Sequence, residues 1–100
     1  MIVRLWRGLA RPQHAEEYLA HLRADTIPQL SRIPGFVAVE VLRREEPKGT
    51  EFLVATTWES LSAIERFAGA DVTLAVVPDQ VQRLMVEFDH RVRHYEVMAP

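Results

Sequence analysis

The sequence predicts one α+β domain whose strands and helices follow the order β-α-β-β-α-β. Residues 2–7, 36–44 and 51–58 are short runs rich in β-branched and aromatic residues, which is typical of strands. Helical spacing of apolar residues follows the first and third of these runs, and a Pro/Gly turn joins the second to the third. This order is the ferredoxin-like pattern, in which helices cover one face of an antiparallel four-stranded sheet.

The first helix is expected to begin at Pro12, because proline suits the first turn of a helix. Glu16 and Glu17 then lie near its positive end. Pro28 lies inside the same periodic stretch and is expected to kink or break the helix near Ile27. The apolar stripe of this region consists of Ala15, Tyr18, Leu19, Leu22, Ile27 and Leu30.

The second half of the chain is expected to contain a split helical region and a last strand. Ser60 can cap a helix that ends at Gly69. Pro78 can start a further helix, and residues 89–97 are expected to form the last strand. The inward side of the further helix would carry Val81, Leu84, Met85 and Phe88.

Both faces of the predicted sheet are apolar. One face of the second strand carries Val37, Val39 and Val41, and the other carries Phe36, Ala38 and Leu42. Because two helices cover only one face, a second copy of the chain is the simplest cover for the other, and we expect a homodimer with the valine face buried. The alternative is that one face is exposed to water.

Length and composition restrict the class of protein. The 100 residues make a single domain, 1–100, and 12 basic and 14 acidic residues leave a formal charge of −2. This balance argues against nucleic-acid and membrane partners. The chain has no cysteine and no signal-peptide pattern, so we expect a cytoplasmic protein without disulfides or thiolate chemistry.

The four histidines do not predict a metal site. His90 and His94 lie on one strand about 13 Å apart, which is too far to bind one ion. His21 and Asp25 lie one helical turn apart without a third ligand, so we expect a hydrogen bond at the helix surface. His94 is the candidate catalytic residue, because a half-buried imidazole titrates near neutrality and can accept a proton. The alternative is a structural, hydrogen-bonded histidine.

Aromatic side chains are the candidate substrate-binding residues. Trp6 and Trp58 lie on strands that neighbour each other in this fold, and both are expected to face the helices. They would form part of a wall for a flat organic ligand, with His94 at its rim. The alternative is that these aromatics only fill the core. The remaining members of the predicted wall are Tyr18, Phe52, Val54 and Phe67.

Several segments resemble the small antibiotic biosynthesis monooxygenase (ABM) family over nearly the whole chain. They are Pro34-Gly35-Phe36, Trp58-Glu59-Ser60, the spacing of Ile64, Phe67 and Gly69, and His94-Tyr95-Glu96-Val97. The resemblance implies a dimeric α/β barrel that uses no metal and no flavin. It also implies oxidation of a small phenolic or polyketide-like aromatic compound, with the deprotonated substrate itself reducing dioxygen.

The match to the family's functional residues is partial. Trp58 matches the tryptophan that closes the third strand in quinone-forming members. Those members carry an asparagine and a tyrosine where this chain has Val54 and Ile64. The resemblance therefore implies a monooxygenase-like protein with His94 as proton acceptor and Trp6, Trp58 and Phe67 shaping the pocket. The alternatives are a non-catalytic small-molecule-binding or stress-associated dimer, and an isomerase on the same fold.

The haem-degrading members of the family need three other side chains. These are an asparagine on the first strand, a tryptophan in the helix after the third strand and an axial histidine. The corresponding positions hold Trp6, Phe67 and Val77. Because no iron ligand remains, the resemblance does not imply haem degradation.

Overall fold

The central strand of the structure is β1 (Ile2–Ala10), which pairs antiparallel with three other strands. On one side lies β3 (Gly49–Trp58), which pairs in turn with β2 (Phe36–Glu46). On the other side β4 (Met85–Phe88) and β5 (Arg93–Glu96) share the length of β1. The computed structural model describes all residues 1–100 and confirms an α+β, ferredoxin-like architecture.

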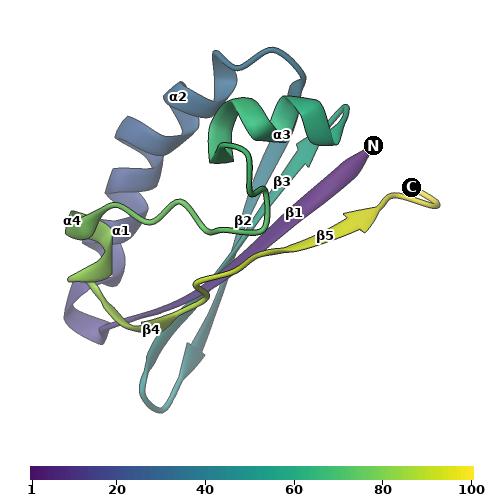
Figure 1. Cartoon of the computed structure of the whole chain (residues 1–100). Helices are drawn as coiled ribbons and strands as arrows, with labels where there is room; N and C mark the ends of the chain where they lie inside the picture. Colours follow the sequence, from purple (N-terminus) through teal and green to yellow (C-terminus); the bar gives the residue numbers. More distant parts are fainter.

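The helices lie together on one face of this sheet (Figure 1). After a 3-10 turn (Pro12–His14), the first helical region contains α1 (Ala15–His21) and α2 (Ile27–Ser31). The second contains α3 (Leu61–Ala68), whose N-terminus is capped by the Ser60 hydroxyl, and the single turn α4 (Asp79–Gln82). Every helix is too short, or too polar, to cross a lipid bilayer.

The predicted break near Ile27 takes the form of a π-helical segment, Leu22–Thr26, between α1 and α2. The Ile27 N–H donates to the carbonyl of Leu22, five residues back. In a regular α-helix the Pro28 ring would press on the carbonyl four residues earlier. The wider π turn accommodates the proline, so the chain bends at this point and remains helical.

The predicted helix through Leu84, Met85 and Phe88 is wrong. The helical turn α4 ends at Gln82, and Met85–Phe88 forms strand β4. The last strand is also shorter than the predicted 89–97, because it is confined to β5 (Arg93–Glu96). The physical reason is the free edge of β1, whose unpaired backbone groups are satisfied by two short strands, and this pairing outweighs a weak helical periodicity.

The side chains of β1 and β3 alternate between two faces, and their register shows which residues face the helices. Trp6 lies opposite Val54 and Ile2 lies opposite Trp58, so the two tryptophans share a face, as predicted. Trp58 packs with Leu30 and residues of α3, on the helix-covered side. This face contains two buried clusters, one around Trp58 and one around Phe52.

The valines of β2 do not form the uncovered face, and that part of the prediction is wrong. A bulge between Phe36 and Ala38 shifts the alternation, so Val39 and Val41 pair beside Thr56 and Val54 and point toward the helices. The opposite face of the sheet has no cover within the chain (Figure 1). Its apolar side chains are Val3, Leu5, Leu42, Leu53, Ala55 and Tyr95, and the same face carries the charged residues Arg7, Glu40, Arg44, Glu51 and Arg93.

Candidate functional site

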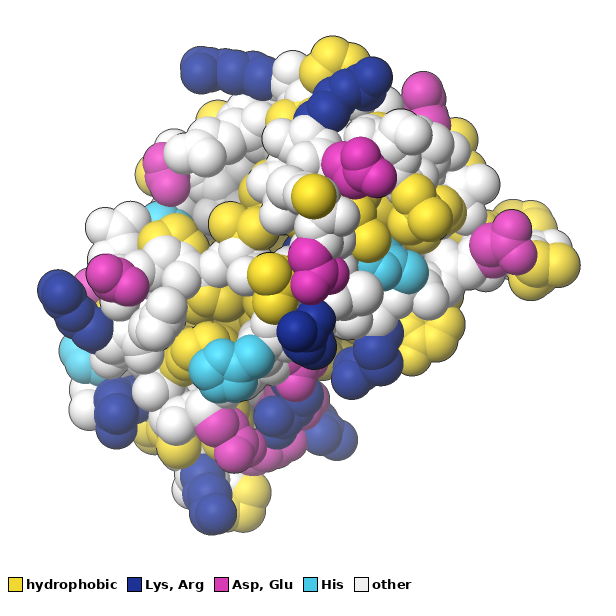
Figure 2. All heavy atoms as spheres, in the orientation of Figure 1, with side chains coloured by type: hydrophobic (Ala, Val, Ile, Leu, Met, Phe, Trp, Pro, Cys, Tyr) yellow, Lys and Arg dark blue, Asp and Glu magenta, His cyan; other side chains and the backbone are white.

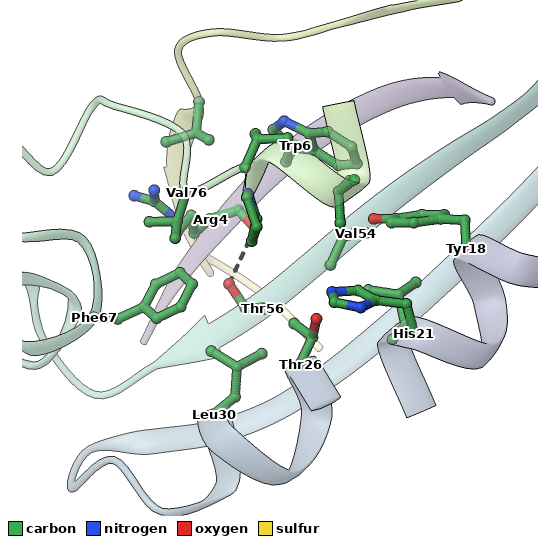
Figure 3. A pocket seen from close by; sticks show the side chains of 15 residues that line it. Arg4, Trp6, Tyr18, His21, Thr26, Leu30, Val54, Thr56, Phe67 and Val76 are labelled. Carbon is green, nitrogen blue, oxygen red and sulfur yellow. Dashed lines mark hydrogen bonds between the residues drawn. The ribbon is translucent and has the colours of Figure 1, made fainter. Parts of the chain in front are cut away.

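A cavity lies between the helix layer and the sheet, lined by side chains from β1, β3, the first helical region and the segment 76–81 (Figure 3). Its volume is about 70 Å³, and ten of its fifteen lining residues are hydrophobic. Pockets for drug-sized ligands usually measure about 300–1,000 Å³. The size of this cavity therefore favours a compound with one ring.

Two aromatic residues of the predicted wall form one end of this cavity. Trp6 and Tyr18 lie with ring centroids 6.1 Å apart, and the Trp6 indole Nε1 donates to the carbonyl of Asp89 at 2.9 Å. Burial raises the pKa of the Tyr18 hydroxyl, which therefore stays protonated. This hydroxyl makes no hydrogen bond within the chain, and Figure 3 shows it on the cavity side of the helix. It is thus a free donor for a ligand.

The structure brings four of the predicted binding residues to the cavity and leaves two outside it. Phe52 and Trp58 do not line the cavity, because each is 0% exposed and fills the core behind it. Trp58 packs beside Phe67 at 6.0 Å, and its Nε1 donates to Thr56 Oγ1 at 2.8 Å. Its contribution is to hold two lining side chains from behind. The predicted residues that do line the cavity are Trp6, Tyr18, Val54 and Phe67.

His94 does not reach the cavity, contrary to the expectation that it forms the rim. It lies on β5 directly opposite Arg4 of β1, and Arg4 Nη1 lies 3.3 Å from His94 Nε2. Arg4 lines the cavity and His94 does not, so the arginine separates the imidazole from it. Burial, and then the Arg4 charge, lowers the pKa of His94 below its usual value.

His21 is the histidine that lines the cavity, although its sequence pattern predicts a position at the helix surface. Its Nε2 lies 3.7 Å from Asp25 Oδ2, and its Nδ1 lies 3.4 Å from Gln80 Nε2. The π-helical segment brings residues five apart to one side, so His21 and Thr26 both face the cavity (Figure 3). The five-residue step from Leu22 to Ile27 in the apolar stripe is the sequence signal for this wider turn.

Arg4 and Thr56 are the other polar lining residues that the sequence analysis missed. Arg4 is a charged residue on the same face of β1 as Trp6, where the pattern of the strand is otherwise apolar. Its guanidinium donates to the carbonyls of Val72 and Leu74, the second at 2.6 Å. Nowhere do three or more His, Asp or Glu side chains gather in a way that could hold a metal ion.

The fold and the cavity define a small ferredoxin-like domain with a site for a small molecule. The family model described as antibiotic biosynthesis monooxygenase matches residues 1–79, so the chain belongs to the ABM family. Membership supports a monooxygenase-like or small-molecule-binding role, and members of the family often form dimers. No curated protein matches the chain.

Solved structures share the fold over almost the whole chain. A candidate antibiotic biosynthesis monooxygenase from Nitrosomonas europaea is 14% identical, with a TM-score of 0.74 over 99% of this chain and 100% of that chain. One from Deinococcus radiodurans is 17% identical, with a TM-score of 0.70 over 100% and 95%. A mutant of MhuD, whose structure holds two manganese protoporphyrin IX molecules per active site, is 21% identical, with a TM-score of 0.65 over 100% and 97%. At these identities the similarity establishes the fold alone.

We expect no specific haem binding in this chain. Trp6, Phe67 and Val77 all line the cavity, so the position of the family's axial histidine is apolar, and a volume of about 70 Å³ is too small for a macrocycle. Titration with haemin should therefore produce no saturable shift of the haem absorption band. A one-to-one shift that disappears in His21→Ala, the variant that removes the one histidine in the cavity, would contradict this expectation.

Proposed function

We propose that this protein is a cofactor-independent, monooxygenase-like enzyme that oxidises a small phenolic compound and works as a homodimer. The observation that supports this best is the composition of the cavity. Trp6 and Phe67 supply aromatic surface for a flat ring, and the remaining wall is largely aliphatic. A few polar groups, chiefly the Tyr18 hydroxyl and the His21 imidazole, lie where they can orient and deprotonate a phenol.

The proposed reaction needs a base and a dry site. His21 accepts the phenol proton, and the resulting phenolate supplies the electrons that reduce dioxygen. One oxygen atom bonds to a ring carbon in place of hydrogen, and the other leaves as water, so a phenol and one dioxygen give a quinone and one water. The aliphatic wall around Val54 and Val76 excludes solvent from the reactive ring. The Tyr18 hydroxyl donates a hydrogen bond that orients the substrate.

The base is assigned to His21 in preference to His94. His21 lines the cavity, whereas His94 lies behind Arg4. The Asp25 carboxylate lies 3.7 Å from His21 Nε2, where it can orient the imidazole. Burial, and then the charge of the adjacent Arg4 guanidinium, lowers the pKa of His94 and so weakens it as a proton acceptor. The two histidines therefore make a matched pair of variants.

The test is oxygen uptake with a panel of single-ring phenols and hydroquinones. We expect the wild type to exceed the uncatalysed rate, and His21→Gln to lower kcat by about 10²-fold or more, as for loss of a general base. The control, His94→Gln, should leave kcat nearly unchanged. A loss confined to His94→Gln would transfer the role to His94, and equal rates in all three proteins would remove both histidines from the mechanism.

A second candidate function is binding without catalysis. Val54 lines the cavity and Ile64 lies in the core, and both are apolar where quinone-forming members of the family have polar side chains, which favours binding without catalysis. In that case phenols would quench the fluorescence of Trp6 saturably, and no member of the panel would consume oxygen. Absence of both signals would contradict both candidate functions.

The homodimer is proposed from the uncovered face of the sheet. Leu42 and Leu53 are direct neighbours across β2 and β3, and Leu5 and Ala55 continue the apolar surface on β1 and β3. On the side of the molecule drawn in Figure 2, charged side chains of both signs are interspersed with hydrophobic ones. A second copy of the same sheet is apolar in the same places and can cover this face.

A further inference from the structure

Arg4 is a buried cation without a counter-ion. The residue is 4% exposed, and no carboxylate lies within 4.0 Å of its guanidinium. Arg7, three residues along the same strand, points to the other face and is paired with Glu51 at 2.5 Å. An unpaired charge in a dry site is unfavourable, and here burial lowers the pKa of Arg4 to about 10. The structure thus contains positive charge that nothing in the chain balances.

The hydrogen bonds of Arg4 fix its direction and leave some of its five N–H donors free. The two Nη atoms donate to the carbonyls of Val72 and Leu74 and approach His94. The Nε hydrogen has no acceptor in the chain. Because every polar side-chain atom that is buried from solvent has a hydrogen-bond partner, Nε must be accessible. Since Arg4 itself lines the cavity and is otherwise enclosed, the cavity is where a partner can approach.

The remaining charges around the cavity do not compensate for Arg4. No aspartate or glutamate lines it, and its other polar lining groups are hydroxyls and the imidazole of His21. The guanidinium lies 5.7 Å from the centroid of the Phe67 ring, so the positive group adjoins the aromatic surface. A ligand that meets both has a flat ring and an anionic group attached to it.

We propose that the cavity selects a small aromatic acid, bound as its carboxylate, with Arg4 as the group that binds the anion. This inference rests on the proposed function and specifies its substrate class. The ring lies against Trp6 and Phe67, and the carboxylate accepts hydrogen bonds from the guanidinium. A carboxylate is favoured over a neutral phenol because it carries full negative charge at neutral pH and supplies the missing counter-ion.

The test compares 4-hydroxybenzoate with 4-hydroxybenzamide, which have nearly the same shape and differ in charge. Affinities are measured by calorimetry at pH 7 with the full chain. We expect the wild type to bind the acid at least about 10-fold more tightly than the amide, which corresponds to about 1.4 kcal/mol. Arg4→Met should abolish this preference by lowering the affinity for the acid and leaving that for the amide unchanged. Arg4→Lys should retain part of the preference.

The control variant is Arg66→Met, which also removes a guanidinium that donates to a backbone carbonyl, at 2.8 Å, but from the exposed surface of α3. It should keep the full preference for the acid. Equal affinity of the wild type for acid and amide, no binding of either at millimolar concentration, or a preference that survives in Arg4→Met would overturn the inference. If Arg4→Met fails to fold, Arg4→Lys and the wild-type ligand pair still decide.

The outcome separates this inference from the proposed function. Turnover of neutral phenols without any preference for acids would support the proposed enzymatic function and overturn the role of Arg4. Tight binding of the acid without oxygen uptake by any acidic or neutral phenol would retain the role of Arg4 and contradict the proposed chemistry.

Discussion

Trp58→Ala should lower the free energy of unfolding by about 3–5 kcal/mol, the range for removal of a large aromatic side chain from a core. Trp58 is 0% exposed and lies among Phe36, Ile64 and Phe67. Its removal leaves a cavity that the surrounding strand and helix cannot fill, and it also deprives Thr56 Oγ1 of a hydrogen bond of 2.8 Å. Urea unfolding at a fixed protein concentration measures the loss.

The matched control is the same substitution at Trp6, which is half-buried at the cavity wall. Compared with Trp58→Ala, Trp6→Ala should lower the free energy of unfolding less and weaken ligand binding more, because it removes part of the binding surface. Trp58→Ala should show the reverse balance. If the two variants lost equal stability, or Trp58→Ala lost less than about 1 kcal/mol, the assignment of Trp58 to the core and Trp6 to the site would be wrong.

Leu42→Asp should convert the proposed homodimer into a monomer. Leu42 is 50% exposed in the single chain and lies on the uncovered face of the sheet beside Leu53. A carboxylate here is harmless in an isolated chain, but in a dimer interface it becomes an unpaired buried charge. Sedimentation velocity at micromolar concentration should show a wild-type dimer and a folded Leu42→Asp monomer.

The control for this variant is Leu61→Asp on α3. Leu61 is 47% exposed, so the two leucines are matched in residue type and exposure and differ in the face that they occupy. Leu61→Asp should remain dimeric. A wild type that sediments as a folded monomer would contradict the homodimer, and dissociation of both variants alike would show that the effect is not specific to the sheet face.

The fold was predictable where residue pattern and pairing agree. The strands of the hairpin β2–β3 follow from alternation and from the turn at residues 47–49. Met85–Phe88 was misassigned because its four residues fit either period, and only the unpaired edge of β1 decides between them. The bulge after Phe36 likewise arises from contacts with β3 that one strand's sequence does not reveal, and it reversed the predicted direction of Val39 and Val41.

The candidate site was predictable where the alternation of side chains along a strand determines which face each residue occupies. Trp6 and Val54 share a face because they are paired across β1 and β3. The same alternation puts Trp58 on that face but does not reveal that it lies in the core and outside the cavity. His21 was misjudged because a regular α-helix was assumed at the point where the π turn begins. The absence of a counter-ion for Arg4 depends on all elements around it, so it becomes visible only in the assembled fold.

The contacts of Arg4 also have a consequence for the order in which the chain folds. Its partners Val72, Leu74 and His94 lie 68, 70 and 90 positions further along the sequence. Trp58, by contrast, packs against Phe67, only a short loop and helix away. Closing long loops costs chain entropy before their contacts form. We therefore expect the contact of Trp58 with Phe67 to form earlier than the contacts of Arg4, so that this end of the cavity closes late in folding.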